Sequence, residues 1–173
     1  SHVRMMKTDY EDTGLAQLFG MPFVVLRKPV PFDTTTLNFN WQVWDTKAFS
    51  LYSRSTEKID KKGADMAIAA VCRFLSRMNV LNYNVYGGYE STVLIEEELV
   101  SLRSTASGLY IPHVKSFDSV ERGQVLADII DPLTGVTVAQ TEAPEDGIVF
   151  FAKDSPLVME NETLFKIVNK LHK

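Results

Sequence analysis

Residues 108–129 read Gly108-Leu-Tyr-Ile-Pro112 and then Val120-Glu-Arg-Gly-Gln-Val-Leu-Ala-Asp-Ile129, and residues 147–167 repeat the pattern as Gly147-Ile-Val-Phe-Phe151 and Val158-Met-Glu-Asn-Glu-Thr-Leu-Phe-Lys-Ile167. In this repeat Gly123 matches Asn161, and Gly and Asn are the residue types that enter a left-handed turn at the lowest cost. A doubled strand–turn–strand unit predicts a small all-β domain with approximate twofold symmetry, in which each copy covers the apolar face of the other.

The repeat lies within a longer β-rich region. Strands are predicted at 91–95, 99–103, 109–112, 125–130, 136–139, 147–151 and 164–168. Asp131-Pro-Leu-Thr-Gly135 is typical of a hairpin turn between two of them. The polar stretch 82–90, which contains Gly87-Gly88, indicates the domain boundary. We therefore expect one domain over 1–85 and a doubled β domain over 86–173.

Residues 1–80 have a different character. Helices are predicted at 11–20, at 37–44 and from Asp60 onward, and buried strands at 22–26 and 47–53. This alternation is typical of a layered α/β domain. Two strands are too few for an independent sheet, so we expect residues 1–80 to be the C-terminal part of such a domain.

The helix that begins near Asp60 has the clearest apolar pattern in the chain. Its apolar positions are Ala64, Ala67, Ile68, Val71, Phe74, Leu75 and Met78. We expect this face to be core, with Arg73 and Arg77 lying elsewhere on the helix. Cys72, the only cysteine, is expected to be a buried and inert thiol, and a single cysteine fits a cytoplasmic protein.

Composition excludes several classes of function. The 173 residues are 45% hydrophobic and 23% charged, which is the balance of a globular protein. The net charge of −4 argues against nucleic acid as a partner, and no apolar run is long enough to cross a membrane. The chain begins Ser1-His2 without a signal-peptide pattern, so we expect it to start partway through a longer gene product or to carry an expression remnant.

Catalytic motifs are sparse. The three histidines, His2, His113 and His172, show none of the spacings of a zinc site, and no metal site is predicted within the chain. Glu96-Glu97-Glu98 alternates faces and is interpreted as a solvated edge. Glu57 follows a predicted strand, at a position where α/β enzymes often place chemistry.

The doubled β unit, with Gly108-Leu-Tyr-Ile-Pro-His-Val, Asp131-Pro-Leu-Thr-Gly and Ala143-Pro-Glu-Asp-Gly-Ile-Val-Phe, resembles the C-terminal domain of the succinylglutamate desuccinylase/aspartoacylase family of carboxypeptidase-like zinc hydrolases. The resemblance implies the C-terminal part of a mixed-sheet domain, followed by a barrel-sandwich domain similar to biotinyl or lipoyl modules. It also implies hydrolysis of a C–N amide bond in a small N-acyl amino acid or a peptide-like substrate, with zinc activating water and a glutamate moving the proton.

The sequence departs from that family at the reacting groups. The family's zinc ligands, a His-x-x-Glu element and a later His, have no counterpart here, so zinc is implied for the full-length family and not for this chain alone. By the same resemblance Tyr52 holds the place of the catalytic glutamate, and Tyr, with a reference pKa near ~10, is a poor general base. Glu57 is a candidate substitute. A carrier role is not expected, because residues 128–141 contain no lysine.

Two hypotheses follow. In the first, the chain is the C-terminal portion of a zinc-dependent deacylase or carboxypeptidase-like hydrolase. In the second, it is a ligand- or partner-binding module that has lost the catalytic glutamate. Because a half sheet leaves apolar surface and a strand edge open, we also expect either self-association or completion by a missing N-terminal segment.

Overall fold

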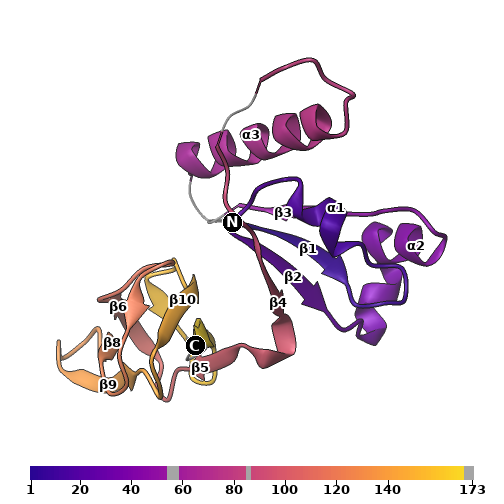
Figure 1. Ribbon diagram of the computed structural model, residues 1–173. Coiled ribbons are helices and arrows are strands. Elements are labelled where there is room, and N and C mark those ends of the chain that lie inside the picture. Colours follow the sequence, from indigo (N-terminus) through magenta and orange to yellow (C-terminus); the bar gives the residue numbers. More distant parts are fainter. Residues whose placement is uncertain (54–58, 85–86, 170–173) are drawn as a thin grey trace. The chain divides into compact units, whose positions relative to one another are not determined.

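A computed structural model describes residues 1–53, 59–84 and 87–169 (Figure 1). The chain divides into two compact units, Ser1–Glu97 and Glu98–Lys173. The division falls later than the boundary expected at residue 85. The reason is that β4 (Thr92–Ile95), interpreted from the sequence as a strand of the β region, pairs with β2 (Phe23–Arg27) of the first unit.

The first unit is built on a four-stranded mixed sheet in the order β3-β1-β2-β4. β1 (His2–Met6) is parallel to β2, β2 is parallel to β4, and β3 (Ser50–Tyr52) is antiparallel to β1. β2 and β3 confirm the two strands predicted in this region. β1 was not predicted, and together with β4 it doubles the sheet.

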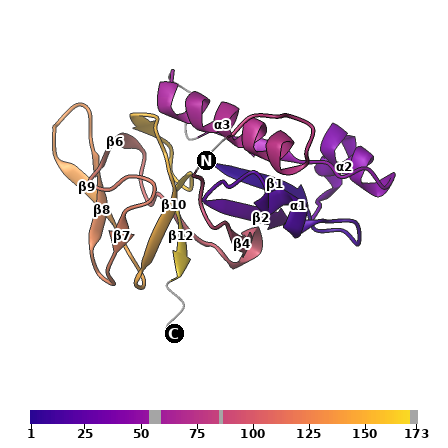
Figure 2. The same cartoon turned by 45° about the horizontal axis from the view of Figure 1, so that its top comes forward.

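The helices of this unit are α1 (Thr13–Gln17), the 3-10 helix η1 (Pro31–Thr35), α2 (Leu37–Val43) and α3 (Lys61–Arg77). Their starts are fixed by side chains that accept hydrogen bonds from free backbone N–H groups. Asp12 accepts from Leu15 N at 2.9 Å, Thr36 caps α2, and Asp60 caps α3 as predicted. Figure 2 shows α3 lying across the sheet.

The expected orientation of α3 is only partly confirmed, because Phe74 packs against the core and stacks on Phe19 but shares that side with Arg73. Arg73, expected away from the core, is buried, and its Nη1 donates to the carbonyl oxygen of Phe19 at 2.5 Å. Arg77 donates to the carbonyl oxygen of Leu18 at 2.9 Å, so both arginines satisfy carbonyl groups at the end of α1. Four of the residues predicted as core are instead exposed: Ala64, Ile68, Val71 and Met78.

Glycine makes room for Arg73. A Cβ atom added to Gly88 would lie 2.8 Å from Arg73 Nε, and one added to Gly20 would lie 2.9 Å from its Cδ. Both glycines also have positive φ angles, of 109° and 60°. The packing of α3 therefore depends on backbone features that its own apolar periodicity does not reveal.

The second unit contains two four-stranded antiparallel sheets, β5-β12-β10-β7 and β11-β6-β8-β9. The strands are β5 (Val100–Arg103), β6 (Gly108–Pro112), β7 (Ser119–Val120), β8 (Val125–Ile130), β9 (Thr137–Glu142), β10 (Gly147–Ala152), β11 (Leu157–Val158) and β12 (Thr163–Asn169). A short 3-10 helix, η2 (Glu96–Glu98), precedes them. Neither sheet closes into a barrel over residues 98–169, and the barrel-sandwich arrangement stays a prediction.

The predicted repeat is confirmed, and its two copies exchange strands. β7 of the first copy pairs with β10 of the second, and β11 of the second pairs with β6 of the first. The registers correspond: Val120 lies opposite Gly147, and Val158 lies opposite Gly108. Gly123 and Asn161 both adopt left-handed φ angles, of 80° and 66°.

The exchange builds one core from both copies. Its fully buried members include Leu126, Ile129, Leu164 and Ile167, which are the matched apolar positions of the repeat. The hairpin turn between β8 and β9 also forms as predicted, with Gly135 N donating to the carbonyl oxygen of Asp131 at 2.8 Å. In the described part of the chain, no helix is both long and apolar enough to cross a membrane.

Candidate functional site

Tyr52, the predicted site residue that the structure describes, lies at the end of β3. Its backbone pairs with His2 of β1, and the two rings stack with centroids 4.9 Å apart and an interplanar angle of 1°. The side chain is 39% exposed. The second predicted residue, Glu57, lies outside the described residues.

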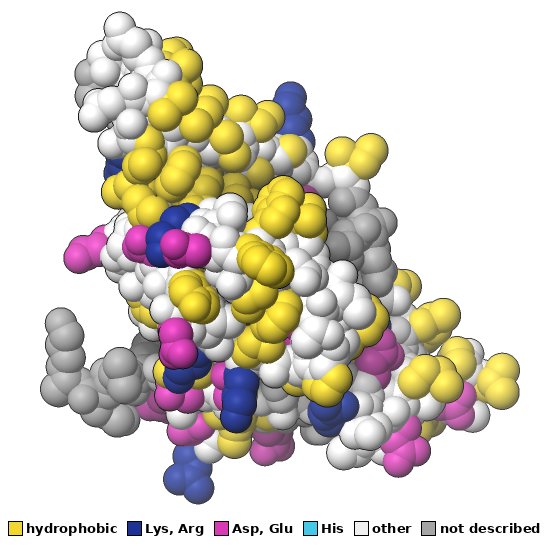
Figure 3. Space-filling view, turned by 90° about the vertical axis from the view of Figure 1, so that its right-hand side faces the viewer, with side chains coloured by type: hydrophobic (Ala, Val, Ile, Leu, Met, Phe, Trp, Pro, Cys, Tyr) yellow, Lys and Arg dark blue, Asp and Glu magenta, His cyan; other side chains and the backbone are white. Residues whose placement is uncertain are grey.

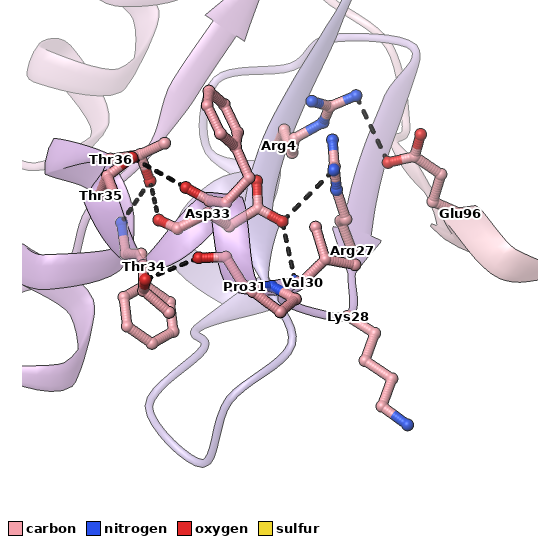
Figure 4. A network of polar contacts seen from close by, with 12 residues as sticks. Arg4, Arg27, Lys28, Val30, Pro31, Asp33, Thr34, Thr35, Thr36 and Glu96 are labelled. Carbon is pink, nitrogen blue, oxygen red and sulfur yellow. Dashed lines mark hydrogen bonds and ion pairs between the residues drawn. The ribbon is translucent and has the colours of Figure 1, made fainter.

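Arg4 holds the Tyr52 ring. Its Nη1 donates to the Tyr52 hydroxyl at 3.1 Å, and its guanidinium carbon lies 4.5 Å from the ring centroid, a cation–π geometry. Its Nη2 lies 3.4 Å from Glu96 Oε2, which follows β4 (Figure 4). Arg4 thus connects both edges of the sheet.

Strand alternation explains this arrangement. Val3 and Met5 of β1 point into the apolar core under the helices, so His2 and Arg4 lie on the opposite face. Arg4 pairs directly with Ser50, whose Oγ accepts from Asn38 Nδ2 of α2 at 2.9 Å. The sheet face around Tyr52 is therefore polar.

Two buried polar atoms on this face have no hydrogen-bond partner among the described residues. Within the described part of the chain, neither Arg4 Nε nor Asn38 Oδ1 makes a hydrogen bond. Buried donors and acceptors are normally satisfied by protein or by an ordered small molecule such as water. One unused donor and one unused acceptor indicate that this face can take a polar ligand.

The chemistry available to Tyr52 follows from its contact with Arg4. Because Arg4 donates to the phenol oxygen, the hydroxyl proton is directed elsewhere and can be donated to a bound oxygen atom. A donor fixed in this way suits a carbonyl or oxyanion group better than it suits proton abstraction.

A second network lies beside the Arg4–Glu96 pair, at the C-terminal end of β2. Arg27 Nη2 is 3.3 Å from Oδ2 of Asp33, and that same oxygen accepts from Val30 N at 2.9 Å (Figure 4). Asp33 is only 4% exposed, and it fixes the loop that leads into α2. This network therefore has a structural role.

The acidic run is the solvated edge that we expected only in part: Glu97 and Glu98 are exposed, whereas Glu96 is half-buried. Glu96 pairs with Arg4, and Glu97 Oε1 accepts from Lys28 N at 2.9 Å. Glu96 thus binds a side chain of β1, and Glu97 binds the backbone of the residue that follows β2. These contacts were not expected, because the sequence did not show that β4 joins this sheet.

His113 belongs to the second unit. Its Nε2 is 2.8 Å from Asp128 Oδ2, and Gln140 donates to Asp128 Oδ1 at 2.8 Å. The hydrogen bond from Gln140, and next that from His113, lower the pKa of Asp128 below its ordinary value. The expected surface role of His113 agrees with this exposed pair.

The described residues do not fit a zinc site. No group of three His, Cys, Asp or Glu side chains converges in residues 1–53, 59–84 and 87–169. Sequence reasoning missed Arg4 and His2 as neighbours of Tyr52. The available signal was the alternation of His-Val-Arg-Met at residues 2–5, which is typical of a strand with one polar face.

The sequence matches no family model and no curated protein. The fold, in contrast, is similar to that of several solved structures. The product-bound ectoine utilization protein EutE (DoeB) from Ruegeria pomeroyi matches with a TM-score of 0.78 at 12% identity, over 98% of this chain and 53% of its own. A succinylglutamate desuccinylase/aspartoacylase from Rhodobacter sphaeroides matches with a TM-score of 0.76 at 14% identity, over 99% and 54%.

A succinylglutamate desuccinylase from a Silicibacter species matches with a TM-score of 0.73 at 13% identity, over 96% of this chain and 53% of its own. The chain thus spans about half the length of these proteins. Its mixed α/β architecture with three sheets is the fold of their C-terminal part, and the resemblance seen in the sequence agrees with this.

Proposed function

We propose that the chain is the C-terminal portion of a deacylase-like hydrolase that cleaves the C–N amide bond of an N-acyl amino acid or a peptide-like substrate. The observation that carries this proposal is the fold similarity, which extends over nearly the whole chain and includes both units. The polar sheet face around Tyr52 supports it as one wall of the site.

In this proposal Tyr52 is a hydrogen-bond donor to the substrate carbonyl, and it does not replace the glutamate as a base. Arg4 is a positioning residue, because it holds the phenol oxygen and is itself held by Glu96. Zinc, which the family resemblance implies, would polarise the same carbonyl. Its ligands would come from polypeptide other than the described residues.

The first test is an assay of the 173-residue chain with zinc against a panel of N-acyl amino acids, beside a full-length gene product. We expect turnover only from the longer protein. Turnover by the shorter chain alone would contradict the assignment of a partial site.

Tyr52 also favours a second function, that of a non-catalytic binding module. Calorimetric titration of the longer protein with N-acyl amino acids would show binding without turnover in that case. Tyr52→Phe and Tyr52→Glu distinguish the two functions. In a hydrolase with a tyrosine donor, Tyr52→Phe lowers kcat by roughly 10²-fold, in line with the loss of one oxyanion donor. In a binding module neither variant has any activity to lose.

A further inference from the structure

Arg73 is a buried cation to which residues 1–53, 59–84 and 87–169 supply no acidic partner. Its side chain is 7% exposed, and none of the carboxylates in these ranges forms an ion pair with it. Burial, followed by repulsion from Arg77, lowers the pKa of Arg73, so its surroundings disfavour the charge. Because the desolvation of a buried charge is costly, such a group is normally paired with a counter-charge.

The protein uses only one corner of the Arg73 guanidinium. Nη1 donates to the carbonyl oxygen of Phe19 at 2.5 Å and lies 3.4 Å from that of Gly20. Nε is buried, and neither Nε nor Nη2 makes a hydrogen bond with any residue that the structure describes. In a guanidinium, the Nε–H bond and one Nη2–H bond are parallel and form the edge that binds the two oxygens of a carboxylate. This edge of Arg73 has no protein partner among the described residues.

Arg77 shows that capping of α1 does not account for this edge. Arg77 donates to the carbonyl oxygen of Leu18 at 2.9 Å from an exposed position, where its other N–H groups are hydrated. Arg73 makes the same kind of contact with Phe19, but its Nε is shielded from water. Capping therefore explains the position of Nη1 and leaves Nε and Nη2 unexplained.

Two glycines keep the space beside the guanidinium free of side chains. A Cβ atom at Gly88 would lie 2.8 Å from Nε and 3.0 Å from Cζ of Arg73, and one at Gly20 would lie 3.0 Å from Nη1. Gly88 is itself exposed, so this side of the guanidinium lies close to the surface. In Figure 3, hydrophobic side chains gather at the height that α3 occupies in Figure 1. Opposite charges attract more strongly in such surroundings than in water.

We propose that Arg73 is the centre of a carboxylate-binding site, in which Nε and Nη2 donate to the two carboxylate oxygens while Nη1 stays on Phe19. A carboxylate matches the two parallel N–H bonds, and it supplies the counter-charge that the described residues do not. The carboxylate belongs either to a free small molecule or to an Asp or Glu side chain of a longer protein. The site is separate from the proposed hydrolase function, and its test needs no turnover.

Acetate is the probe for this site, and acetamide, which has a similar shape and no charge, is the matched control ligand. In the 173-residue chain with ¹⁵N-labelled arginine, the Nε–H resonance of Arg73 can be assigned through its own side-chain carbons. We expect acetate to shift this resonance in a saturable way and acetamide to leave it unchanged. Acetate should also raise the thermal midpoint of the first unit above its value in chloride at the same ionic strength.

Two variants separate this site from general effects of acetate. Arg73→Lys keeps the charge and a donor for Phe19 but removes the two-pronged edge, so it should raise the half-saturating acetate concentration by at least about tenfold. Arg103→Met is the matched control, because Arg103 also donates to a backbone carbonyl, that of Asn161 at 2.8 Å, from an exposed position in the second unit. This variant should respond to acetate like the native chain.

The same spectrum of a longer gene product distinguishes the two sources of the carboxylate. If the carboxylate is a free molecule, acetate shifts the Arg73 resonance in both proteins. If it is a side chain of the longer protein, the resonance is already shifted there before acetate is added. A resonance that is equal in both proteins and insensitive to acetate would overturn the proposal. An acetate response that Arg73→Lys retains in full would also overturn it, and the native spectra decide the case if that variant does not fold.

Discussion

At the scale of single residues, the second unit depends on glycines that permit close contact between strands. A Cβ atom added to Gly108 would lie 2.5 Å from the carbonyl oxygen of Ile130, and one added to Gly147 would collide with the Ile167 side chain. These glycines occupy equivalent places in the two copies of the repeat. The symmetry therefore extends from the apolar positions to the points of closest backbone approach.

Gly108→Ala should lower the free energy of unfolding of the second unit by roughly 2–4 kcal/mol, because strand β8 would have to move. Gly135→Ala is the matched control. Gly135 has a φ of 72° but open space around its Cα, so its substitution should cost only about 1 kcal/mol. Urea unfolding followed by circular dichroism measures both. Equal losses of stability in the two variants would show that the cost at Gly108 comes from backbone conformation and not from the contact with Ile130.

Asp128 should make the stability of the second unit depend on pH. Its hydrogen bonds to Gln140 and His113 lower its pKa in the folded state. A carboxylate with a lowered pKa stabilises the fold above its unfolded pKa of about 3.9, and this stabilisation is lost as the pH falls through the folded pKa. Asp128→Asn should therefore make the free energy of unfolding fall less steeply as the pH is lowered. Urea midpoints measured between about pH 2 and pH 6 test this, and an unchanged slope would assign the acid sensitivity to Asp131 or Glu162, whose pKa values are also lowered.

At the scale of elements, the sequence predicted which segments are regular better than it predicted how they face. The capping of α3 by Asp60 and the turn after β8 were predictable because they are decided within a few residues. The orientation of α3 was not predictable, because it depends on a hydrogen bond from Arg73 to a carbonyl group at the end of α1, which lies far away in the sequence. β1 and the place of β4 were missed for the same reason: sheet order is not a local property.

The two arginines of α3 should contribute differently to the stability of the first unit. Arg73→Met removes a charged donor from the buried carbonyl of Phe19, and burial, followed by repulsion from Arg77, already lowers the pKa of Arg73. We expect a loss of about 2–3 kcal/mol in the stability of the first unit. Arg77→Met is the control and should cost less than about 1 kcal/mol, because Arg77 is exposed. Thermal unfolding of the two variants separates these outcomes.

At the scale of the whole molecule, the candidate site was half visible from the sequence. Tyr52 could be named from the resemblance alone. Its partners His2 and Arg4 lie on β1, and Glu96, which holds Arg4, follows β4, so that only the sheet brings these segments together. The two units have separate apolar clusters, one built from residues before Glu98 and one from residues after it. Each cluster is formed by its own unit.

Residues 98–173 should therefore fold without residues 1–97. The core of the second unit is complete within its own sequence, and its matched apolar positions are fully buried. We expect the isolated piece to unfold cooperatively in urea and to show β-type circular dichroism. Dispersed amide resonances in a nuclear magnetic resonance spectrum would confirm this, and a collapsed spectrum would show that the first unit is required.

The crossing of β7 and β11 between the two copies also sets an order of events during synthesis. A ribosome releases Gly108–Ile130 well before Leu157–Val158, so the first hairpin leaves the exit tunnel without the strand that completes its sheet. Its apolar face stays uncovered until the second copy has been made. The unit is therefore committed to folding late and all at once, and a chaperone would encounter it chiefly as an unpaired half.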